Sequence, residues 1–334
     1  MSVQRGYETF LDHPDLVERW RRLGMDVGDP VVAERILRTY GYHRLTSYSY
    51  VFRRMLPEDQ RDPQTRLFRD IFFVEGTSLE AVTRLYEFDS RLREVFLRGL
   101  FDFETRLRAA IAHVLASRSP LAHIEEQHLN EKACRQGTYS GSTKFEAWKE
   151  TYRESLEGAV DEDFIVHHVR TPSQELPVWA TVELVSFGKL PFLFDLMRQE
   201  DQNRVARRFG VRNGRQFGKW IRALVELRNL CAHGSRIFNR RIKYAIKINP
   251  AAVVGSQLEH LESKPGRSDI YIYSAILAYL LLSHESGSAW PVGSLKTQAR
   301  KLARFVPVVD GKPLLTLEEN MGFPHGWEQL ELWQ

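Results

Sequence analysis

Apolar residues recur at helical spacing along most of the chain, whereas the strict alternation that indicates half-buried strands is rare. The segment 30–40 is typical. Asp29 and Pro30 suit the cap and the first position of a helix, apolar residues then follow at roughly helical intervals, and Gly41 suits the end. The pattern predicts a mainly α protein with few or no strands.

Two further segments carry the same spacing. After Thr77-Ser78 the pattern runs to about Ala116 and is interrupted only by Gly99. It predicts either one very long helix or two helices with a kink at that glycine. Residues 145–170 are also predicted to be helical, and Thr171-Pro172 ends them.

The strongest amphipathic pattern covers residues 216–233, and Gly234 follows where a helix cap is expected. Before it lies an apolar stretch, 177–196, in which Gly188 and Pro191 predict a turn. The residues that share one face of the helix over 216–233 are Phe217, Trp220, Ile221, Leu224, Leu227 and Cys231.

Charge is distributed unevenly along the chain. The net charge is only +4, but residues 204–247 hold thirteen Lys and Arg and a single acid, Glu226. A basic block in an otherwise acidic protein suggests a binding site for a polyanion such as nucleic acid. The alternative is a solvated helix face whose arginines pair with acids elsewhere.

Composition limits the cellular setting. The two cysteines, Cys134 and Cys231, exclude a disulfide scaffold and a four-cysteine zinc site, and they suit a reducing cytoplasm. The first residues lack the apolar core of a signal peptide. The longest apolar run, 270–283, is too short to span a bilayer and is expected to be a buried core helix. We therefore expect a cytoplasmic protein without a membrane partner.

Three residues near the end of the helix over 216–233 carry candidate chemistry: Arg228, Asn229 and His233. RNA can be cut by its own 2′-hydroxyl if a base takes the 2′ proton, an acid protonates the leaving 5′ oxygen and a cation holds the phosphorane. Histidine serves in either proton role, and arginine offers a fork of donors that matches phosphate oxygens. No carboxylate cluster and no metal or other cofactor is required.

The geometry leaves an alternative open. Asn229 shares a helix face with His233, but Arg228 and His233 lie about 140° apart on an ideal helix. A site that needs both would use a loosened last turn or a second copy of the helix. Otherwise Arg228 is a salt-bridge partner, His233 a cation at a helix C-terminus and Asn229 a local hydrogen bonder.

Other motifs in the chain do not support a different chemistry. Residues 134–144 form a small, polar loop, but their lysine follows Ser-Thr, whereas a phosphate-binding loop has Gly-Lys-Ser/Thr. His123 and His128 are five residues apart, not the four of a zinc helix, and His167-His168 are adjacent. We expect no metal site.

Several blocks of sequence, in order along nearly the whole chain, resemble one protein family. The blocks are Leu23–Met25, Tyr40–Tyr48, Leu85–Arg93, Phe103–Arg108, Pro177–Ala180 with Glu183, Ser186–Leu190, Leu227–His233, Arg236–Arg240, and Met321–Pro324 with Trp327. Together they are similar to the Abi-like family of abortive-infection proteins, the AbiD/AbiF group, which belongs to the HEPN superfamily.

The resemblance implies a HEPN-like helical bundle with additional helices and a metal-independent endoribonuclease. It also implies a homodimer with a composite active site, in which each copy contributes Arg228, Asn229 and His233, and products with a 2′,3′-cyclic phosphate and a 5′-hydroxyl. The implied biology is a toxin-like response to phage, held in check by an RNA or a protein antitoxin. One departure is Gly234, where many family members have a second histidine. The alternative is an inactive HEPN module that binds a non-coding RNA or a partner protein.

The resemblance also points to residues around this centre. Glu104, Arg108 and Glu183 are candidates to support it, although Glu104 and Arg108, four apart on one helix, equally suit a structural ion pair. Aromatics within 40–52 suit base stacking or, as is more common, a core. The candidates for RNA binding are Arg207, Arg208, Arg212, Arg215, Lys219, Arg236, Asn239, Arg240 and Arg241.

The chain shows no internal repeat, and the Gly/Ser/Pro-rich residues 255–268 are the best candidate for a boundary. We expect residues 1–75 to form an N-terminal helical region packed on the core. Residues 76–250 form the HEPN-like core with the motif, and residues 251–334 complete the same domain.

Overall fold

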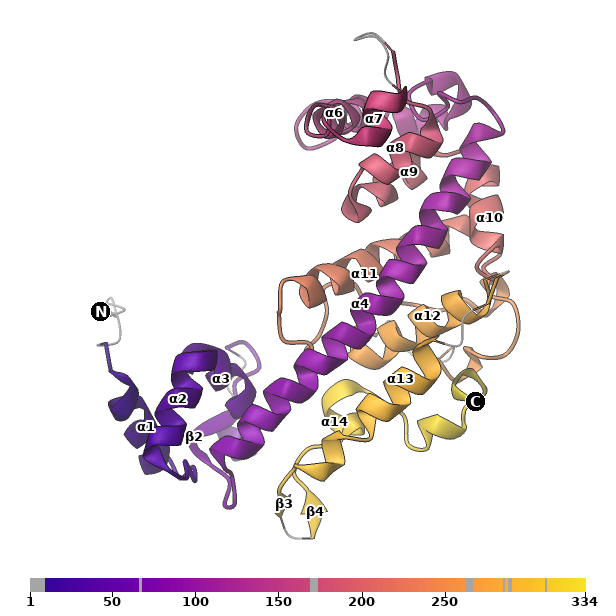
Figure 1. The fold of residues 1–334 in the computed structure, drawn as a ribbon. Helices are drawn as coiled ribbons and strands as arrows, with labels where there is room; N and C mark the ends of the chain where they lie inside the picture. Colours follow the sequence, from indigo (N-terminus) through magenta and orange to yellow (C-terminus); the bar gives the residue numbers. More distant parts are fainter. Residues whose placement is uncertain are drawn as a thin grey trace. The chain divides into compact units, whose positions relative to one another are not determined.

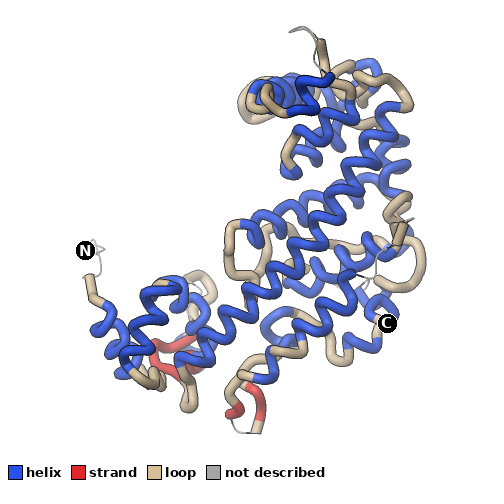
Figure 2. The backbone as a smooth tube through the Cα atoms, viewed as in Figure 1, coloured by secondary structure: helices blue, strands red, loops and turns tan. Residues whose placement is uncertain are grey.

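The structure is a computed structural model, and it describes residues 10–65, 68–168, 174–261, 267–284, 286–287, 290–309 and 311–334. Helices form most of this part of the chain (Figure 2). Within it, strands form only two small antiparallel pairs, β1–β2 and β3–β4. The prediction of a mainly α protein with few strands is confirmed.

Contacts divide the chain into two compact units. The first comprises residues 1–92 and 297–320, and the second comprises residues 93–296 and 321–334. Helix α4 (Leu79–Ala116) begins in the first unit and ends in the second (Figure 1). The division into 1–75, 76–250 and 251–334 stays a prediction.

Local signals account for both ends of α2 and for the start of α4. The side chain of Asp29 caps α2 by accepting a hydrogen bond from the Val32 amide, and Gly41 ends this helix with a φ of 78°. Ser78 Oγ accepts a hydrogen bond from the Ala81 amide at the start of α4. Helix α4 then continues through Gly99 as one helix of 38 residues, which decides between the two alternatives, one long helix or two with a kink, that the sequence left open.

The first unit has an aromatic core. Tyr48 is buried, and its hydroxyl donates to Asp89 at 2.7 Å, while Trp20 stacks on Tyr42. Tyr48 and Phe52 are therefore core residues, not a stacking platform for bases. The elements of this unit besides α4 are α1 (His13–Arg22), α2 (Pro30–Tyr40), α3 (Tyr42–Ser49), η1 (Tyr50–Phe52), β1 (Arg53–Met55), η2 (Glu58–Gln60), β2 (Arg69–Phe73), η7 (Leu302–Arg304), β3 (Val308–Val309), β4 (Lys312–Pro313) and α14 (Leu317–Met321).

The second unit is built around α11, which packs against α9, α10 and α12 (Figure 1). Phe103 of α4 lies edge-on to Phe187, Phe209 and Phe217 and joins these helices in one aromatic core. The elements of this unit besides α4 are η3 (Glu126–His128), α5 (Glu131–Cys134), α6 (Lys144–Glu157), α7 (Asp163–His168), α8 (Val178–Leu184), η4 (Phe187–Lys189), α9 (Leu190–Leu196), α10 (Gln199–Arg207), α11 (Gly214–Ala232), η5 (Pro250–Ala252), η6 (Glu259–Leu261), α12 (Ile270–Leu282), α13 (Trp290–Ala299), η8 (Trp327–Gln329) and η9 (Glu331–Trp333).

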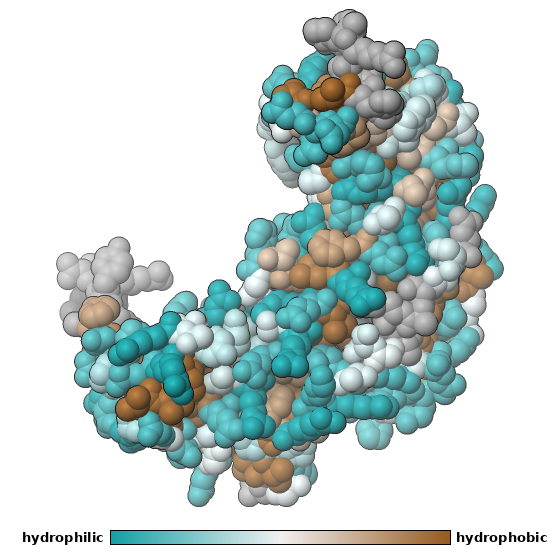
Figure 3. Space-filling view, in the orientation of Figure 1, coloured by the Kyte–Doolittle hydropathy of each residue, from teal (hydrophilic) through white to brown (hydrophobic). Residues whose placement is uncertain are grey.

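Helix α12 is the buried core helix that its apolar run predicts. Every residue from Ile270 to Leu281 is buried. Its buried tyrosine hydroxyls find acceptors: Tyr279 donates to the Gly210 carbonyl and Tyr273 to the Tyr244 carbonyl, each at 2.6 Å. Among the described residues, no helix has both the length and the apolar character needed to cross a membrane, and hydrophilic side chains cover most of the face in Figure 3.

One helix prediction needs correction. Residues 145–170 do not form one helix, because α6 ends at Glu157 and the chain turns at Gly158 before α7 begins at Asp163. The turn brings Ile165 into one apolar cluster with Tyr152 and Ala180, burial that a continued α6 would not provide. The predicted break at Thr171-Pro172 lies outside the described residues.

Candidate active site

Helix α11 carries the three motif residues and is held at both ends. The Asn213 side chain caps its start by accepting a hydrogen bond from the Gln216 amide at 3.1 Å. Its apolar face is buried at all six of the predicted positions. Gly214 and Gly218 allow close packing, since a Cβ on Gly214 would lie 2.6 Å from Gln202 and one on Gly218 would lie 3.2 Å from Phe194.

The C-terminal end of α11 presents His233 to solvent. His233 is the cap residue, and its side chain is exposed. Gly234 follows with a φ of 63°; its amide bonds the Cys231 carbonyl, and the Ser235 amide bonds the Leu230 carbonyl. This pair of bonds is the Schellman motif, whose left-handed position favours glycine. A side chain at position 234 would therefore be strained.

Arg228 packs on an aromatic ring. Its guanidinium lies 5.4 Å from the centre of the Phe187 ring, and Phe187 belongs to η4. Within the described ranges Arg228 forms no ion pair, and its buried Nε has no hydrogen-bond partner. The alternative in which Arg228 is a salt-bridge partner therefore finds no support among the described residues. Its donors are not bound to a carboxylate in that part of the chain.

Asn229 and His233 lie on the same side of α11 near its end. Asn229 is half-buried, and its carbonyl accepts a hydrogen bond from the His233 amide at 3.0 Å. Among the described residues, neither the Asn229 amide nor the His233 imidazole has a side-chain hydrogen bond. Both side chains can therefore reach a ligand at this end of the helix without breaking an existing bond.

The ion pair of Glu104 and Arg108 has a structural role. Arg108 on α4 contacts Glu104 and the Val182 carbonyl, and it donates to the Val185 carbonyl at 2.8 Å. Both members are largely buried. Arg108 thus fixes the chain just before Phe187, the ring under Arg228. Glu183 by contrast is exposed on α8, and no ion pair of the described residues involves it.

The predicted RNA-binding residues separate into three groups. Arg215 and Lys219, both exposed on α11, line the same cavities. Arg207, the last residue of α10, lines another cavity, where Glu200 and Asp201 offset the charge, and Arg208 and Arg212 follow it in the connection to α11. The third group follows His233.

This third group forms a turn after α11. Ile237 and Phe238 are buried and anchor the turn, while Arg240 and Arg241 are exposed. Asn239 has a φ of 47°, a left-handed conformation that asparagine adopts more readily than most residues. Arg240 donates to the Arg236 carbonyl at 3.3 Å.

The segment that contains these elements is similar to a known protein family. The family model described as "Abi-like protein" matches residues 35–239, which is more than half of the chain. The chain belongs to the Abi-like protein family. Comparisons with curated proteins and with solved structures gave no match.

The match covers the motif of this Abi-like protein and its surroundings. It extends from within α2 through α11 to Asn239 and so includes Glu104, Arg108 and Phe187. The similar blocks at Leu23–Met25 and at Met321–Trp327 lie outside the matched range.

The remaining histidine candidates do not form a second centre in the described part of the Abi-like protein. His123 is fully buried, and its Nε2 lies 3.0 Å from Thr181 Oγ1. Burial lowers the pKa of His123 to about 3, so the imidazole stays neutral at neutral pH. His128 pairs instead with Glu125 at 3.2 Å. No group of three or more metal-ligating side chains occurs among the described residues.

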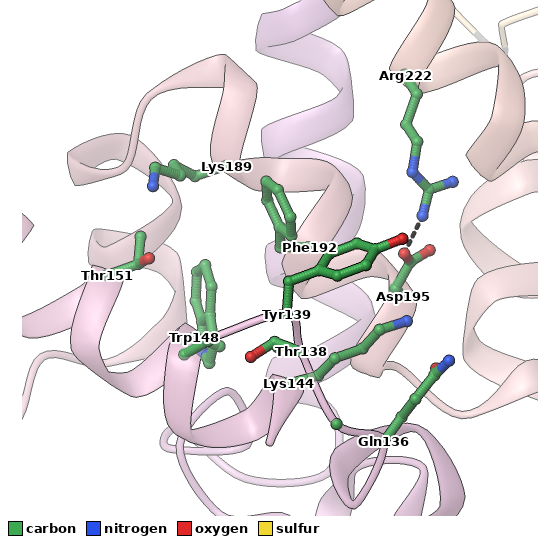
Figure 4. Close-up of a pocket in the computed structure, with 12 residues that line it drawn as sticks. Gln136, Thr138, Tyr139, Lys144, Trp148, Thr151, Lys189, Phe192, Asp195 and Arg222 are labelled. Atoms are coloured by element: carbon green, nitrogen blue, oxygen red, sulfur yellow. Dashed lines mark hydrogen bonds and ion pairs between the residues drawn. The ribbon is translucent and has the colours of Figure 1, made fainter. Parts of the chain in front are cut away.

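The sequence reasoning missed a cavity beside α11 (Figure 4). Tyr139 of the loop between α5 and α6, Lys144 of α6, and Phe192 of α9 line it together with Lys189. Arg222 of α11 reaches it through an ion pair with Asp195. These residues come from stretches that lie far apart in the sequence, so no local pattern marked them. The one available signal was Tyr139, a lone aromatic in a loop of small polar residues.

Proposed function

We propose that this Abi-like protein is a metal-independent endoribonuclease of the HEPN type that acts in abortive infection. Arg228, Asn229 and His233 form its active centre. One observation carries the proposal: these three polar side chains lie near the C-terminal end of α11, and within the described residues none is committed to another side chain by a hydrogen bond or ion pair. A purely structural role for these three residues would not explain why their side chains have no such partner.

The chemistry needs only these groups, the RNA and solvent water. The 2′ oxygen attacks the adjacent phosphorus, its proton passes to a base, and the bond from phosphorus to the 5′ oxygen breaks as that oxygen takes a proton from an acid. His233 serves as the base or the acid, and water serves as the other. The fork of Arg228 binds the phosphorane oxygens, and Asn229 orients the imidazole or binds phosphate. The products are a 2′,3′-cyclic phosphate and a 5′-hydroxyl.

The geometry of α11 favours a site shared by two copies. The helix is regular up to Ala232, so Arg228 and His233 point about 140° apart. Arg228 is also held against the ring of Phe187. A second copy of α11 alongside the first brings the arginine of one copy to the histidine of the other.

The proposed biology follows from the family. The chain acts in the cytoplasm as a toxin that cuts RNA after phage infection, and an RNA or a protein antitoxin inhibits it before infection. Cell growth on induced expression reports this toxicity. We expect growth arrest with the parent protein and normal growth with His233→Ala.

Cleavage of a labelled RNA by the purified protein in EDTA tests the activity. We expect the parent to cut and to leave 2′,3′-cyclic phosphate ends, and His233→Ala to lower the rate by about 10²–10⁴-fold. His325→Ala, a change of another exposed histidine, is the matched control and keeps the parental rate. Parental cleavage by His233→Ala contradicts the assignment. A parent that binds RNA but never cuts it supports the inactive RNA-binding module instead.

A further inference from the structure

Three adjoining cavities form one groove along the N-terminal half of α11. The first, of about 750 Å³, shares Lys144, Asp195 and Arg222 with the second, of about 950 Å³. The second shares Arg215 and Lys219 with a third, of about 430 Å³. We call this continuous surface, formed by the 135–143 loop, α5, α6, η4, α9, α10, α11 and residues 245–249, the α11 groove.

The α11 groove is strongly basic. Its lining contains two acids, and both are already paired: Glu131 with Arg135 at 2.7 Å, and Asp195 with Arg222. Among the described residues, no ion pair involves Lys144, Lys189 or Lys219. This unbalanced charge favours a polyanion. The basic residues of the lining are Lys132, Arg135, Lys144, Lys189, Arg215, Lys219, Arg222 and Lys247.

Two aromatic rings project into the basic groove. Tyr139 is fully exposed at the tip of its loop, and Phe192 is 60% exposed on α9 (Figure 4). Trp148 beneath them is different, because it is buried and its indole N–H donates to the His123 carbonyl. Exposed rings between cations are the surface on which single-stranded bases stack while their phosphates contact lysine and arginine.

We propose that the α11 groove binds single-stranded RNA, with bases stacked on Tyr139 and Phe192. A duplex does not fit this surface as well, because its bases are already stacked and cannot reach the rings. An acidic protein would satisfy the cations but gives no reason for two exposed rings among them. The inference rests on the proposed function, since it names the substrate class of that enzyme and the place where its substrate binds.

The groove leads toward the active centre along one face of α11. Arg215, Lys219 and Arg222 are spaced at helical intervals, and Asn229 continues the same face, within about 80° around the axis. His233 follows Asn229 by one more turn at the cap. Arg222 and His233 are about 16 Å apart along the helix axis. A strand held in the groove can therefore extend over a few nucleotides to the motif residues.

Binding of a labelled oligouridylate of about 12 nucleotides, within the range that single-strand grooves occupy, tests the proposal. The full chain with His233→Ala is used so that the probe stays intact, and anisotropy reports Kd. We expect Tyr139→Ala/Phe192→Ala to weaken binding by at least about tenfold, since two stacking contacts are lost. Phe101→Ala removes an aromatic of similar exposure (56%) outside the groove and keeps the parental Kd.

The salt dependence of Kd tests the role of the groove's positive charge. Lys144→Ala/Lys219→Ala reduces the slope of log Kd against log salt by about 1.4, because two phosphate contacts are lost. Lys149→Ala, on the same helix as Lys144 but outside the cavities, leaves the slope unchanged. All these side chains are on the surface or at the groove, and equal thermal unfolding of the variants verifies that the fold is intact.

Three results overturn the proposal: parental binding by the Tyr139/Phe192 double variant, equal affinity for a duplex of the same length, or displacement of the probe by polyglutamate at equal affinity, which indicates an acidic protein partner. Cleavage by the parent is measured separately. If binding depends on the two rings but the parent does not cleave RNA, the groove is supported as an RNA-binding site and the proposed nuclease activity is refuted. If the double variant cleaves and binds RNA like the parent, the nuclease activity is supported and the groove is refuted as the binding site.

Discussion

At the scale of single residues, His123 and His233 show how position decides what an imidazole can do. His123 lies in the core against Thr181 and edge-on to Tyr152, while His233 stands in solvent at the cap of α11. Water is excluded from His123, so its charged form is disfavoured and its pKa falls to about 3. Such a histidine packs a core, whereas an exposed one can exchange protons with a substrate.

The buried imidazole makes stability depend on pH. In the unfolded chain His123 takes up a proton below a pKa of about 6.5, but in the folded chain it does so only near 3. The free energy of unfolding therefore falls as pH decreases below 6.5, by about 2 kcal/mol between pH 7 and pH 5. Urea unfolding of the parent and of His123→Phe at both pH values measures it. The variant lacks this part of the pH dependence; an identical loss in both proteins refutes the prediction.

Arg228 depends on a chain of contacts, not on its own position alone. Arg108 on α4 donates to the Val185 carbonyl, Val185 leads into the turn of η4, and Phe187 of that turn supports the guanidinium. Arg108 is a positioning residue in this arrangement, because it touches the backbone before the ring and not the motif itself.

At the scale of elements, α11 is placed by glycines at its start. A Cβ on Gly214 would lie 2.6 Å from the side chain of Gln202 and 2.8 Å from its backbone carbon, so α10 and α11 approach as closely as they do only without one. Both helices also carry cations of the candidate RNA surface, and their spacing decides where those cations lie.

Adding one methyl group at this contact is expected to destabilise the protein. Gly214→Ala should lower the free energy of unfolding by about 1–3 kcal/mol, because the backbone of α10 must move. Gly293→Ala is the matched control: this glycine lies in α13 with no atom within 4 Å of its Cβ position, so the change should stabilise by about 0.5–1 kcal/mol. Denaturant unfolding gives both values. Equal effects at the two sites would argue against the close contact.

At the scale of the whole molecule, the proposed composite site predicts complementation between two inactive variants. A heterodimer of Arg228→Ala and His233→Ala retains one intact pairing of arginine and histidine, so we expect about half of the parental cleavage rate. Each variant alone is inactive. Co-expression with two different affinity tags and purification on both isolates the heterodimer for the cleavage assay. An inactive heterodimer contradicts a site shared between copies.

Local sequence was sufficient where neighbouring residues decide the structure. The cap of α2 at Asp29 and the end of α11 at Gly234 each depend on residues within a few positions of one another, whereas the sequence left a kink of α4 at Gly99 open. The order of the similar blocks was sufficient to identify the family, and the Abi-like family model matches residues 35–239. Identity and spacing made Arg228, Asn229 and His233 candidates, and the family resemblance made them the candidate centre.

Packing between distant segments decided the rest. The break after Gly158 exists because Ile165 gains a buried place beside Tyr152 and Ala180 when the chain turns back. The ring under Arg228 comes from a segment about forty residues earlier, and the α11 groove joins a loop with helices spread over the chain. Such contacts gain their free energy only when the whole core forms, so no local pattern encodes them.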